Sequence, residues 1–184
     1  MRQKRRKRIV SYAPEEYTKH YIIQALFKLM NEYEYEKISV TDVTEKAGVG
    51  RATFYRHFKN KEDVIIYFFD HNKREFIFRQ RFYPRCREDY IRVVQDVFTK
   101  FKEEKEPLRL IRKAHLEYIY LEYLNKNFIQ MFREEYPDKS EYQPLGYAGI
   151  LFNISMAWLD NDCADDIKSL SEIVINTIYP NEQK

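Results

Sequence analysis

The sequence predicts an all-α fold with about nine helices, from its few turn residues, its helical periodicities and its helix-start signals. Only four Gly and six Pro occur in 184 residues, whereas an all-β fold needs more turn-forming residues. Strong helix formers run along the whole chain. Hydrophobic residues make up 44% of the sequence, which is enough apolar material for a packed core. The length suits a small module joined to a second domain of about 100 to 150 residues.

The first helix is expected at residues 15–33, where apolar side chains recur at the three- and four-residue spacing of an amphipathic helix. A second helix begins after Ser39, since Ser39 and Asp42 have the spacing of a capping box. It runs only to about Lys46, because Gly48 suits the left-handed conformation that terminates helices. The turn that follows is therefore predicted to be tight.

A third helix is expected at 51–58, and a longer fourth helix follows the cap residue Asn60. The third helix has too few apolar residues for a core element, and a helix-turn-helix presents such a donor-rich face to the DNA major groove. The alternative is an ordinary pair of helices with a polar exterior. The outward residues are Gly50, Arg51, Thr53, Tyr55, Arg56 and His57, and the inward ones are Val43, Ala47, Val49, Phe54 and Phe58.

Five more helices are predicted in the remainder of the chain. Pro107 is expected to break the chain before the second of them, and Pro137 and Pro144 to bracket a polar loop before the fourth. The acidic sequence 160–162 separates the last two. The expected ranges are 91–101, 108–113, 116–135, 145–159 and 167–178.

Charge is divided unevenly along the chain. Residues 1–85 hold 19 Lys and Arg against 11 Asp and Glu, a net charge of +8, whereas residues 86–184 hold 13 against 18, a net charge of −5. A basic module attached to an acidic remainder is typical of a polyanion-binding protein. Six cations stand in residues 2–8, so this segment is predicted to be a flexible arm, either nucleic-acid-binding or merely solubilising.

Several classes of site are not expected. Cys86 and Cys163 stand alone, without a Cys-x-x-Cys pair or a nearby His cluster, so neither a disulfide framework nor a metal site is predicted. The sequence contains no arrangement of a catalytic nucleophile with a base and no phosphate-binding loop, so we do not expect an enzyme. No cofactor is expected either. The basic start lacks the apolar run of a signal peptide, and the apolar stretch 147–159 is shorter than the roughly 20 residues of a bilayer span. We expect a cytoplasmic protein that does not contact membranes.

Residues 38–63 read Ile-Ser-Val-Thr-Asp-Val-Thr-Glu-Lys-Ala-Gly-Val-Gly-Arg-Ala-Thr-Phe-Tyr-Arg-His-Phe-Lys-Asn-Lys-Glu-Asp. This stretch resembles, position by position, the DNA-binding domain of the TetR family of transcriptional regulators, and the match extends over roughly residues 17–69. The resemblance implies a flexible basic arm at 1–13, a helix-turn-helix domain at 14–62, and a helical effector-binding and dimerisation domain at 63–184, joined by the fourth helix.

The resemblance implies base-reading roles in the third helix. Arg51, Thr53 and Arg56 are the expected readers, since Arg pairs bidentately with guanine and a Thr methyl can contact thymine. Gly50 stands where the family often has Ser. This departure removes a side-chain cap and a contact, and it allows close approach of the backbone to DNA.

Contacts to the DNA backbone are implied for four further residues. Thr41 opens the second helix, where its hydroxyl and the backbone amides can hold a phosphate. Tyr55 and His57 resemble the family's phosphate-contacting pair, and Lys61 resembles its phosphate-binding lysine. A catalytic role is the alternative for His57, but no triad partner stands at a suitable spacing. The basic arm is expected to reach the adjacent minor groove through Arg5, Arg6 and Arg8.

In this family the effector site lies among the fifth to seventh helices, which are rich in aromatic residues here. A flat or apolar molecule could stack in such a cavity. Ordinary core packing is the alternative for these aromatic residues, and a packing role is the alternative for the histidine among them. The candidate effector residues are Phe98, Phe101, His115, Tyr120 and Tyr123.

The last two helices carry more apolar surface than one small bundle readily hides. In the family this pair of helices forms a four-helix bundle with its symmetry mate, which implies a C2 homodimer. Gly146 and Gly149 would let the helices approach closely, and an intramolecular core is the alternative. The candidate dimer residues are Ile150, Ile154, Trp158, Leu170, Ile173 and Val174.

The resemblance therefore implies a sequence-specific DNA-binding regulator, with double-stranded DNA as its partner. The default expectation is a homodimeric repressor that leaves a palindromic operator when a small apolar or aromatic effector binds. One alternative stays open. The helix ending in Trp158-Leu159 and the acidic turn after it are distantly similar to the dihydroxyacetone-kinase operon activators, which implies an activator or coregulator that binds a protein partner instead.

Overall fold

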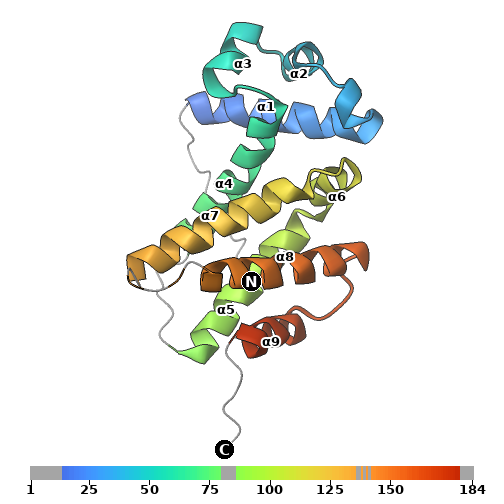
Figure 1. Ribbon diagram of the computed structural model, residues 1–184. Helices are drawn as coiled ribbons and strands as arrows, with labels where there is room; N and C mark the ends of the chain where they lie inside the picture. Colours follow the sequence, from blue (N-terminus) through green and yellow to red (C-terminus); the bar gives the residue numbers. More distant parts are fainter. Residues whose placement is uncertain (1–13, 80–85, 136–137, 139, 141, 179–184) are drawn as a thin grey trace, which may run out of the picture. The chain divides into compact units, whose positions relative to one another are not determined.

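The computed structural model describes residues 14–79, 86–135, 138, 140 and 142–178 (Figure 1). These residues form nine α-helices and one 3-10 helix, with no strand among them, which confirms the predicted all-α class. The chain divides into two compact units, the first ending at Val64 and the second beginning at Ile65. Within the described residues, no helix is both long and apolar enough to cross a bilayer.

The first unit holds α1 (Pro14–Glu32), the 3-10 helix η1 (Tyr35–Lys37), α2 (Val40–Ala47), α3 (Arg51–His57) and the start of α4 (Lys61–Arg79). All four α-helices stand where the sequence predicts them. The single turn of η1 was not predicted, because a three-residue helix has no repeating apolar pattern to indicate it.

The core of the first unit lies where the inward faces of its helices meet. Ile22 and Leu26 of α1 are fully buried, as are Val43 of α2 and Phe54 of α3. Phe58, which ends α3, is 3% exposed. Of the residues predicted to face inward, Ala47 and Val49 are only half-buried, since they flank the turn between α2 and α3.

The second unit contains α5 (Arg87–Glu103), α6 (Lys105–Lys113), α7 (Glu117–Glu135), α8 (Tyr142–Asp160) and α9 (Ile167–Ile178). Its main packing pairs are α7 with α8 and α5 with α9, and α8 also contacts α9. These helices therefore form one bundle in which α8 stands between two partners (Figure 1).

Two prolines lie inside helices and not before them, which corrects the predicted helix starts. Pro107 is the third residue of α6, and Pro144 is the third residue of α8. Amides in the first turn of a helix have no partner within that helix, so proline costs nothing there and its fixed φ suits the helix. The predicted polar loop therefore ends before Tyr142, and Pro144 itself is buried.

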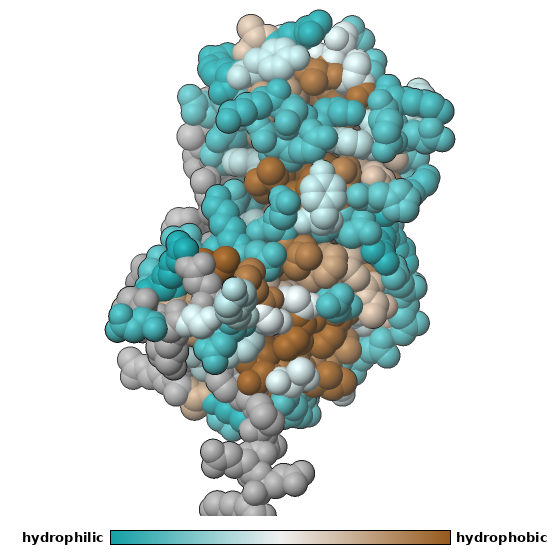
Figure 2. All heavy atoms as spheres, viewed as in Figure 1, coloured by the Kyte–Doolittle hydropathy of each residue, from teal (hydrophilic) through white to brown (hydrophobic). Residues whose placement is uncertain are grey.

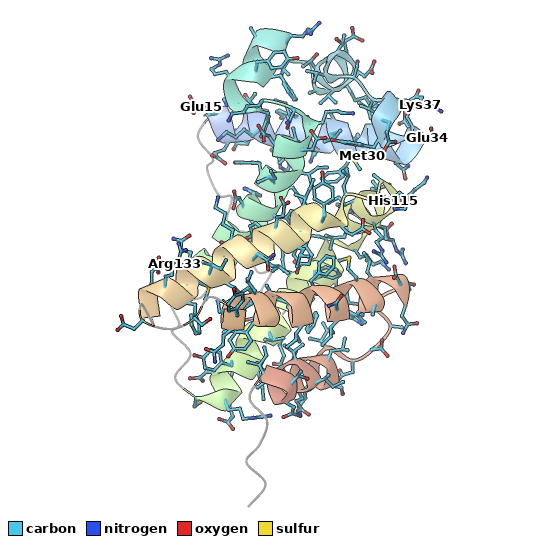
Figure 3. All side chains as sticks on the ribbon, in the orientation of Figure 1. Glu15, Met30, Glu34, Lys37, His115 and Arg133 are labelled. Atoms are coloured by element: carbon cyan, nitrogen blue, oxygen red, sulfur yellow. The ribbon has the colours of Figure 1, made fainter. Side chains whose placement is uncertain are left out.

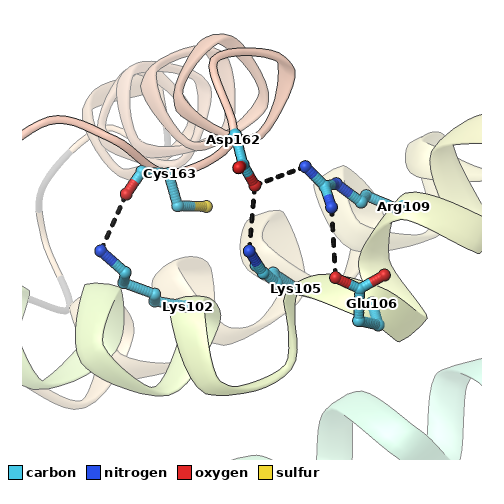
Figure 4. Close-up of polar contacts among 6 residues, drawn as sticks. All are labelled: Lys102, Lys105, Glu106, Arg109, Asp162 and Cys163. Carbon is cyan, nitrogen blue, oxygen red and sulfur yellow. Dashed lines mark hydrogen bonds and ion pairs between the residues drawn. The ribbon is translucent and has the colours of Figure 1, made fainter.

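The turn between α8 and α9 is held by cations from α5 and α6 (Figure 4). The Nζ atom of Lys102 donates to the Cys163 carbonyl oxygen at 2.9 Å. The Asp162 carboxylate accepts from Lys105 Nζ at 3.0 Å and from the Arg109 guanidinium at 2.5 Å. Asp162 and Cys163 both have positive φ, 55° and 53°. This conformation is costly for residues other than glycine, so the cross-links hold a strained turn in place.

Candidate nucleic-acid interface

The start of α2 is fixed by the capping box that the sequence predicts. The Asp42 amide donates to the Ser39 hydroxyl at 3.1 Å, and the Ser39 amide donates to Asp42 Oδ2 at 2.7 Å. The bond from the Ser39 hydroxyl, then that from its amide, lowers the pKa of Asp42. Thr41 is the second residue of this helix and is half-buried, so its hydroxyl stands at a helix N-terminus that is suited to an anion.

The turn from α2 to α3 also has the predicted geometry. Gly48 has φ 68° and ψ 30°, the left-handed conformation, and the Val49 amide donates to the Thr44 carbonyl oxygen at 3.0 Å. Gly50 precedes α3 in an extended conformation and supplies no side-chain cap. A Cβ atom at Gly50 would meet no atom of this chain within 4 Å, so the space in front of α3 is open.

One face of α3 is anchored in the core and the other is turned to solvent. Phe54 is fully buried, and its ring meets the Tyr55 ring edge-on at 5.5 Å between centroids. Tyr55 itself is 51% exposed. Arg51 and Arg56 are exposed as well. Two guanidinium groups and a phenol hydroxyl therefore stand on the outer side of this helix.

Thr53 and His57 are half-buried, at the edges of the exposed face. The Nη2 atom of Arg56 donates to Thr53 Oγ1 at 3.2 Å, which holds the guanidinium along the helix. The His57 ring packs edge-on against Phe58, with 6.4 Å between ring centroids. The predicted readers Arg51, Thr53 and Arg56 thus share one helix of seven residues, while the arm residues Arg5, Arg6 and Arg8 lie outside the described residues.

The side chain of Lys61 contacts groups of its own unit. Its ammonium donates to the carbonyl oxygens of Tyr35 and Ile38, at 2.7 Å and 2.6 Å, and lies 3.9 Å from the centroid of the Tyr35 ring. Burial lowers the pKa of Lys61. The sequence could not indicate this contact, because it joins residues more than twenty positions apart and one of them lies in the unpredicted helix η1.

Four of the five candidate effector residues lie in or beside an aromatic cluster of the second unit. Phe98 is fully buried, and Phe101 and Tyr120 are each 6% exposed. Tyr123 is half-buried. The Phe101 and Tyr120 rings lie 5.9 Å apart. Burial raises the pKa of Tyr120 to about 12 and also raises that of Tyr123.

The fifth candidate, His115, is exposed and lies between α6 and α7 (Figure 3). It has φ 55°, and the amide that follows it, that of Leu116, donates back to the Ile111 carbonyl oxygen at 3.0 Å. This is the left-handed residue that ends a helix in a Schellman-type turn. His115 therefore terminates α6.

The cluster also includes aromatic residues that the sequence did not assign to it. Phe69 stacks on Tyr120 at 5.1 Å and on Tyr123 at 5.5 Å. Trp158 meets Phe98 edge-on at 5.3 Å. These two residues come from α4 and α8, outside the three helices that the resemblance singled out, and only their aromatic character could have suggested them.

The candidate dimer residues fall into two groups. Trp158 and Val174 are 2% and 1% exposed within the single chain, so they belong to its own core. Ile173 is 53% exposed, and Ile150, Ile154 and Leu170 are half-buried. Hydrophobic side chains gather over α8 and α9 on the face shown in Figure 2.

The sequence predicts no metal site, and a metal site would need a cluster of ligating side chains. Among the described residues, no group of three or more His, Cys, Asp or Glu is placed to hold a metal ion.

Comparison with known proteins identifies the N-terminal unit. Residues 22–68 match the model for the bacterial regulatory proteins of the tetR family. An HTH-type transcriptional regulator of Staphylococcus aureus (strain bovine RF122 / ET3-1) is 30% identical over 87 residues, 44% of this chain and 45% of that protein. The HTH-type dhaKLM operon transcriptional activator DhaS of Lactococcus lactis subsp. lactis is 35% identical over 60 residues, 33% of this chain and 32% of that protein. The chain thus spans less than half the length of these curated relatives.

Solved structures share the fold over almost the whole chain. Lin0861 from Listeria innocua has a TM-score of 0.75 at 17% identity, with 93% of this chain and 94% of that chain covered. The transcriptional regulator FadR from Bacillus subtilis, solved in complex with stearoyl-CoA, has a TM-score of 0.52 at 20% identity, with 89% and 99% covered. At such identities the likeness establishes the all-helical fold alone.

Proposed function

We propose that this chain, whose residues 22–68 match the model for the bacterial regulatory proteins of the tetR family, is a homodimeric repressor that binds a palindromic operator and leaves it when a small effector binds. The exposed donor face of α3, anchored from behind by Phe54, is the observation that carries the proposal. A short helix with guanidinium groups outward and a phenyl ring locked inward can enter a major groove without losing its own packing.

Specific recognition is assigned to the outward side chains of α3. Arg51 and Arg56 can each pair with a guanine edge, and Thr53 can contact a thymine methyl. Tyr55, His57 and Thr41 hold the flanking phosphates, which set the register of the helix without reading bases. Gly50 adds no side chain between the helix and DNA.

Selection of binding sites from random duplexes by the purified protein, at a stated salt concentration, tests this assignment. Arg51→Ala is expected to relax the preference at one base pair of each half-site, by about 1–3 kcal/mol of discrimination. Arg92→Ala, which removes an exposed arginine of α5 in the other unit, serves as the matched control and should select the parental sequence. If Arg51→Ala also selects that sequence unchanged, α3 is not the reading helix.

The basic arm is assigned to the adjacent minor groove through Arg5, Arg6 and Arg8. Deletion of residues 2–8 should weaken operator binding and flatten its dependence on salt, by a slope of about 0.9 for each phosphate that the arm neutralises in the full chain. Titrations of the deletion variant and the full chain over a series of salt concentrations measure this slope. If the deletion variant has the same salt-dependence slope as the full chain, the arm does not contact DNA phosphates.

The effector is proposed to be an apolar molecule that inserts beside the aromatic cluster of Phe98, Phe101, Tyr120 and Tyr123. The fold shared with FadR from Bacillus subtilis, solved with stearoyl-CoA, supports a long-chain acyl thioester as the first probe. A ligand that binds the folded state raises its stability with ligand concentration. Stearoyl-CoA should raise the melting temperature and release the selected operator, and coenzyme A should do neither. Equal effects of both would remove the apolar-effector proposal.

A second candidate is an activator or coregulator whose second unit binds a protein partner. The similarity to DhaS of Lactococcus lactis, a transcriptional activator, favours activation. Transcription in vitro from a promoter that carries the selected operator separates the two. A repressor lowers transcript yield as it fills the operator, and an activator raises it.

A further inference from the structure

Lys61 is a member of the predicted DNA-binding set whose ammonium already contacts three groups of its own unit. Its three N–H bonds face two carbonyl oxygens, those of Tyr35 and Ile38, at 2.7 Å and 2.6 Å, and the Tyr35 ring, 3.9 Å from Nζ to the centroid. Charge-assisted hydrogen bonds and a cation–π contact are among the stronger polar interactions in proteins. A DNA phosphate would have to displace one of them.

The two carbonyl groups belong to the segment that leads into α2. Tyr35 begins η1, and Ile38 follows it and directly precedes Ser39, the N-cap of α2. The Ile38 amide also donates to the Tyr35 carbonyl oxygen, at 3.2 Å. Both Tyr35 and Ile38 are buried. The first residue of α4 thus fixes the segment that leads into α2.

Charges near the ammonium fit this role. Glu62, Glu36 and Asp42 all act to keep Lys61 protonated against the effect of its burial. Asp42 is the carboxylate of the capping box, and Lys61 in turn helps to keep it ionised. The ammonium and the capping box are therefore electrostatically linked at the N-terminus of α2, one residue from Thr41.

We propose that Lys61 is a positioning residue that sets the N-terminus of α2 against α4, and that it does not itself bind a DNA phosphate. The proposal rests on the proposed DNA-binding function, because the residue that it positions for phosphate contact is Thr41. Lys61 would then stabilise the segment of Tyr35 and Ile38, although its position in the family pattern implies a contact with DNA.

The test compares Lys61→Met with Lys59→Met, which removes an exposed cation two residues earlier. Hydrogen exchange is first measured on the full-length protein without DNA. Lys61→Met should raise the exchange rates of amides in residues 35–44 by tenfold or more, and Lys59→Met should leave them unchanged. This measurement needs no DNA, so its outcome is independent of whether the operator assignment holds.

Operator binding is then measured over a series of salt concentrations. Lys61→Met should lose affinity by a similar factor at every salt concentration, with the slope of the parent. Removal of a group that binds a phosphate instead reduces the slope by about 0.9. A slope reduced by that amount, or exchange rates equal to those of the parent, overturns the proposal.

A second pair of variants covers the case in which Lys61→Met fails to fold. Tyr35→Leu removes the ring from the ammonium and leaves every charge in place, whereas Tyr35→Phe keeps the ring. Tyr35→Leu should raise exchange in the same segment and weaken DNA binding at an unchanged slope, and Tyr35→Phe should behave like the parent. Equal exchange rates in the two variants contradict the proposed role.

Discussion

Gly50 caps α3 without contributing a side chain. Its φ of −75° and ψ of 150° are open to any residue, and a Cβ atom there meets nothing within 4 Å. Gly50→Ser should therefore raise the free energy of unfolding by about 0.5–1 kcal/mol, because the hydroxyl caps the helix and the unfolded chain loses freedom. Chemical denaturation measures the change. A lower stability would mean that position 50 needs glycine for a reason other than its backbone conformation.

His115 has the left-handed conformation at which glycine is usual. His115→Gly should raise the free energy of unfolding by about 1 kcal/mol, since the strain at Cβ exceeds the added entropy of the unfolded chain. Ala114→Gly is the matched control. Ala114 has φ −84°, so glycine there only adds entropy to the unfolded chain and should destabilise by about 0.5–1 kcal/mol. Thermal unfolding of the pair should give shifts of opposite sign.

At the scale of elements, the α8–α9 turn is secured by ion pairs to α6. The Lys105 hydrogen bond, followed by the charges of Lys105 and Arg109, lowers the pKa of Asp162. The folded-state pKa is thus below the unfolded value of about 3.9. Stability from this carboxylate is present above the unfolded value and is lost as pH falls through the folded one.

The matching prediction concerns Asp162→Asn. Between pH 6 and pH 3 the melting temperature of the parent should fall further than that of this variant, because the variant has no carboxylate at position 162 to protonate. Asp138→Asn, at an exposed aspartate of the same unit, should follow the parent. Because Asp162 is a surface group, its share is small, and parallel curves for parent and Asp162→Asn would show that the turn is held by its backbone alone.

The helix starts also differ in how well the sequence predicts them. Ser39 and Asp42, three residues apart, make the bonds that their spacing predicts, because a cap needs only its own turn of helix. Pro107 and Pro144 misled the prediction for a local reason as well. A proline both breaks a helix interior and suits a first turn, and its neighbours in sequence do not say which.

At the scale of the whole molecule, the outer side of α8 is where a second copy is expected to pack. A side chain at Gly149 meets no atom of this chain at its Cβ position, and arginine favours helix more than glycine does by about 0.8 kcal/mol. Gly149→Arg should therefore leave the folded monomer at least as stable while it abolishes the dimer. Met131→Arg, at a 61% exposed position of α7, should remain dimeric.

Sedimentation velocity of both variants and the parent measures this difference. The proposal requires a dimeric parent and control with a monomeric Gly149→Arg variant. A Gly149→Arg variant that sediments as the parent does would move the interface away from this face of α8.

The sequence by itself determined the features whose causes are local. Helical periodicity, the Ser39–Asp42 cap and the Gly48 turn each depend on residues within two turns of one another, and they suffice to specify an outward α3. Tertiary structure alone decided the rest. Lys61 meets carbonyl groups of a distant segment, His115 takes a helix-ending conformation, and Trp158 enters the chain's own core, because partners in three dimensions are set by how the helices pack and not by their spacing along the chain.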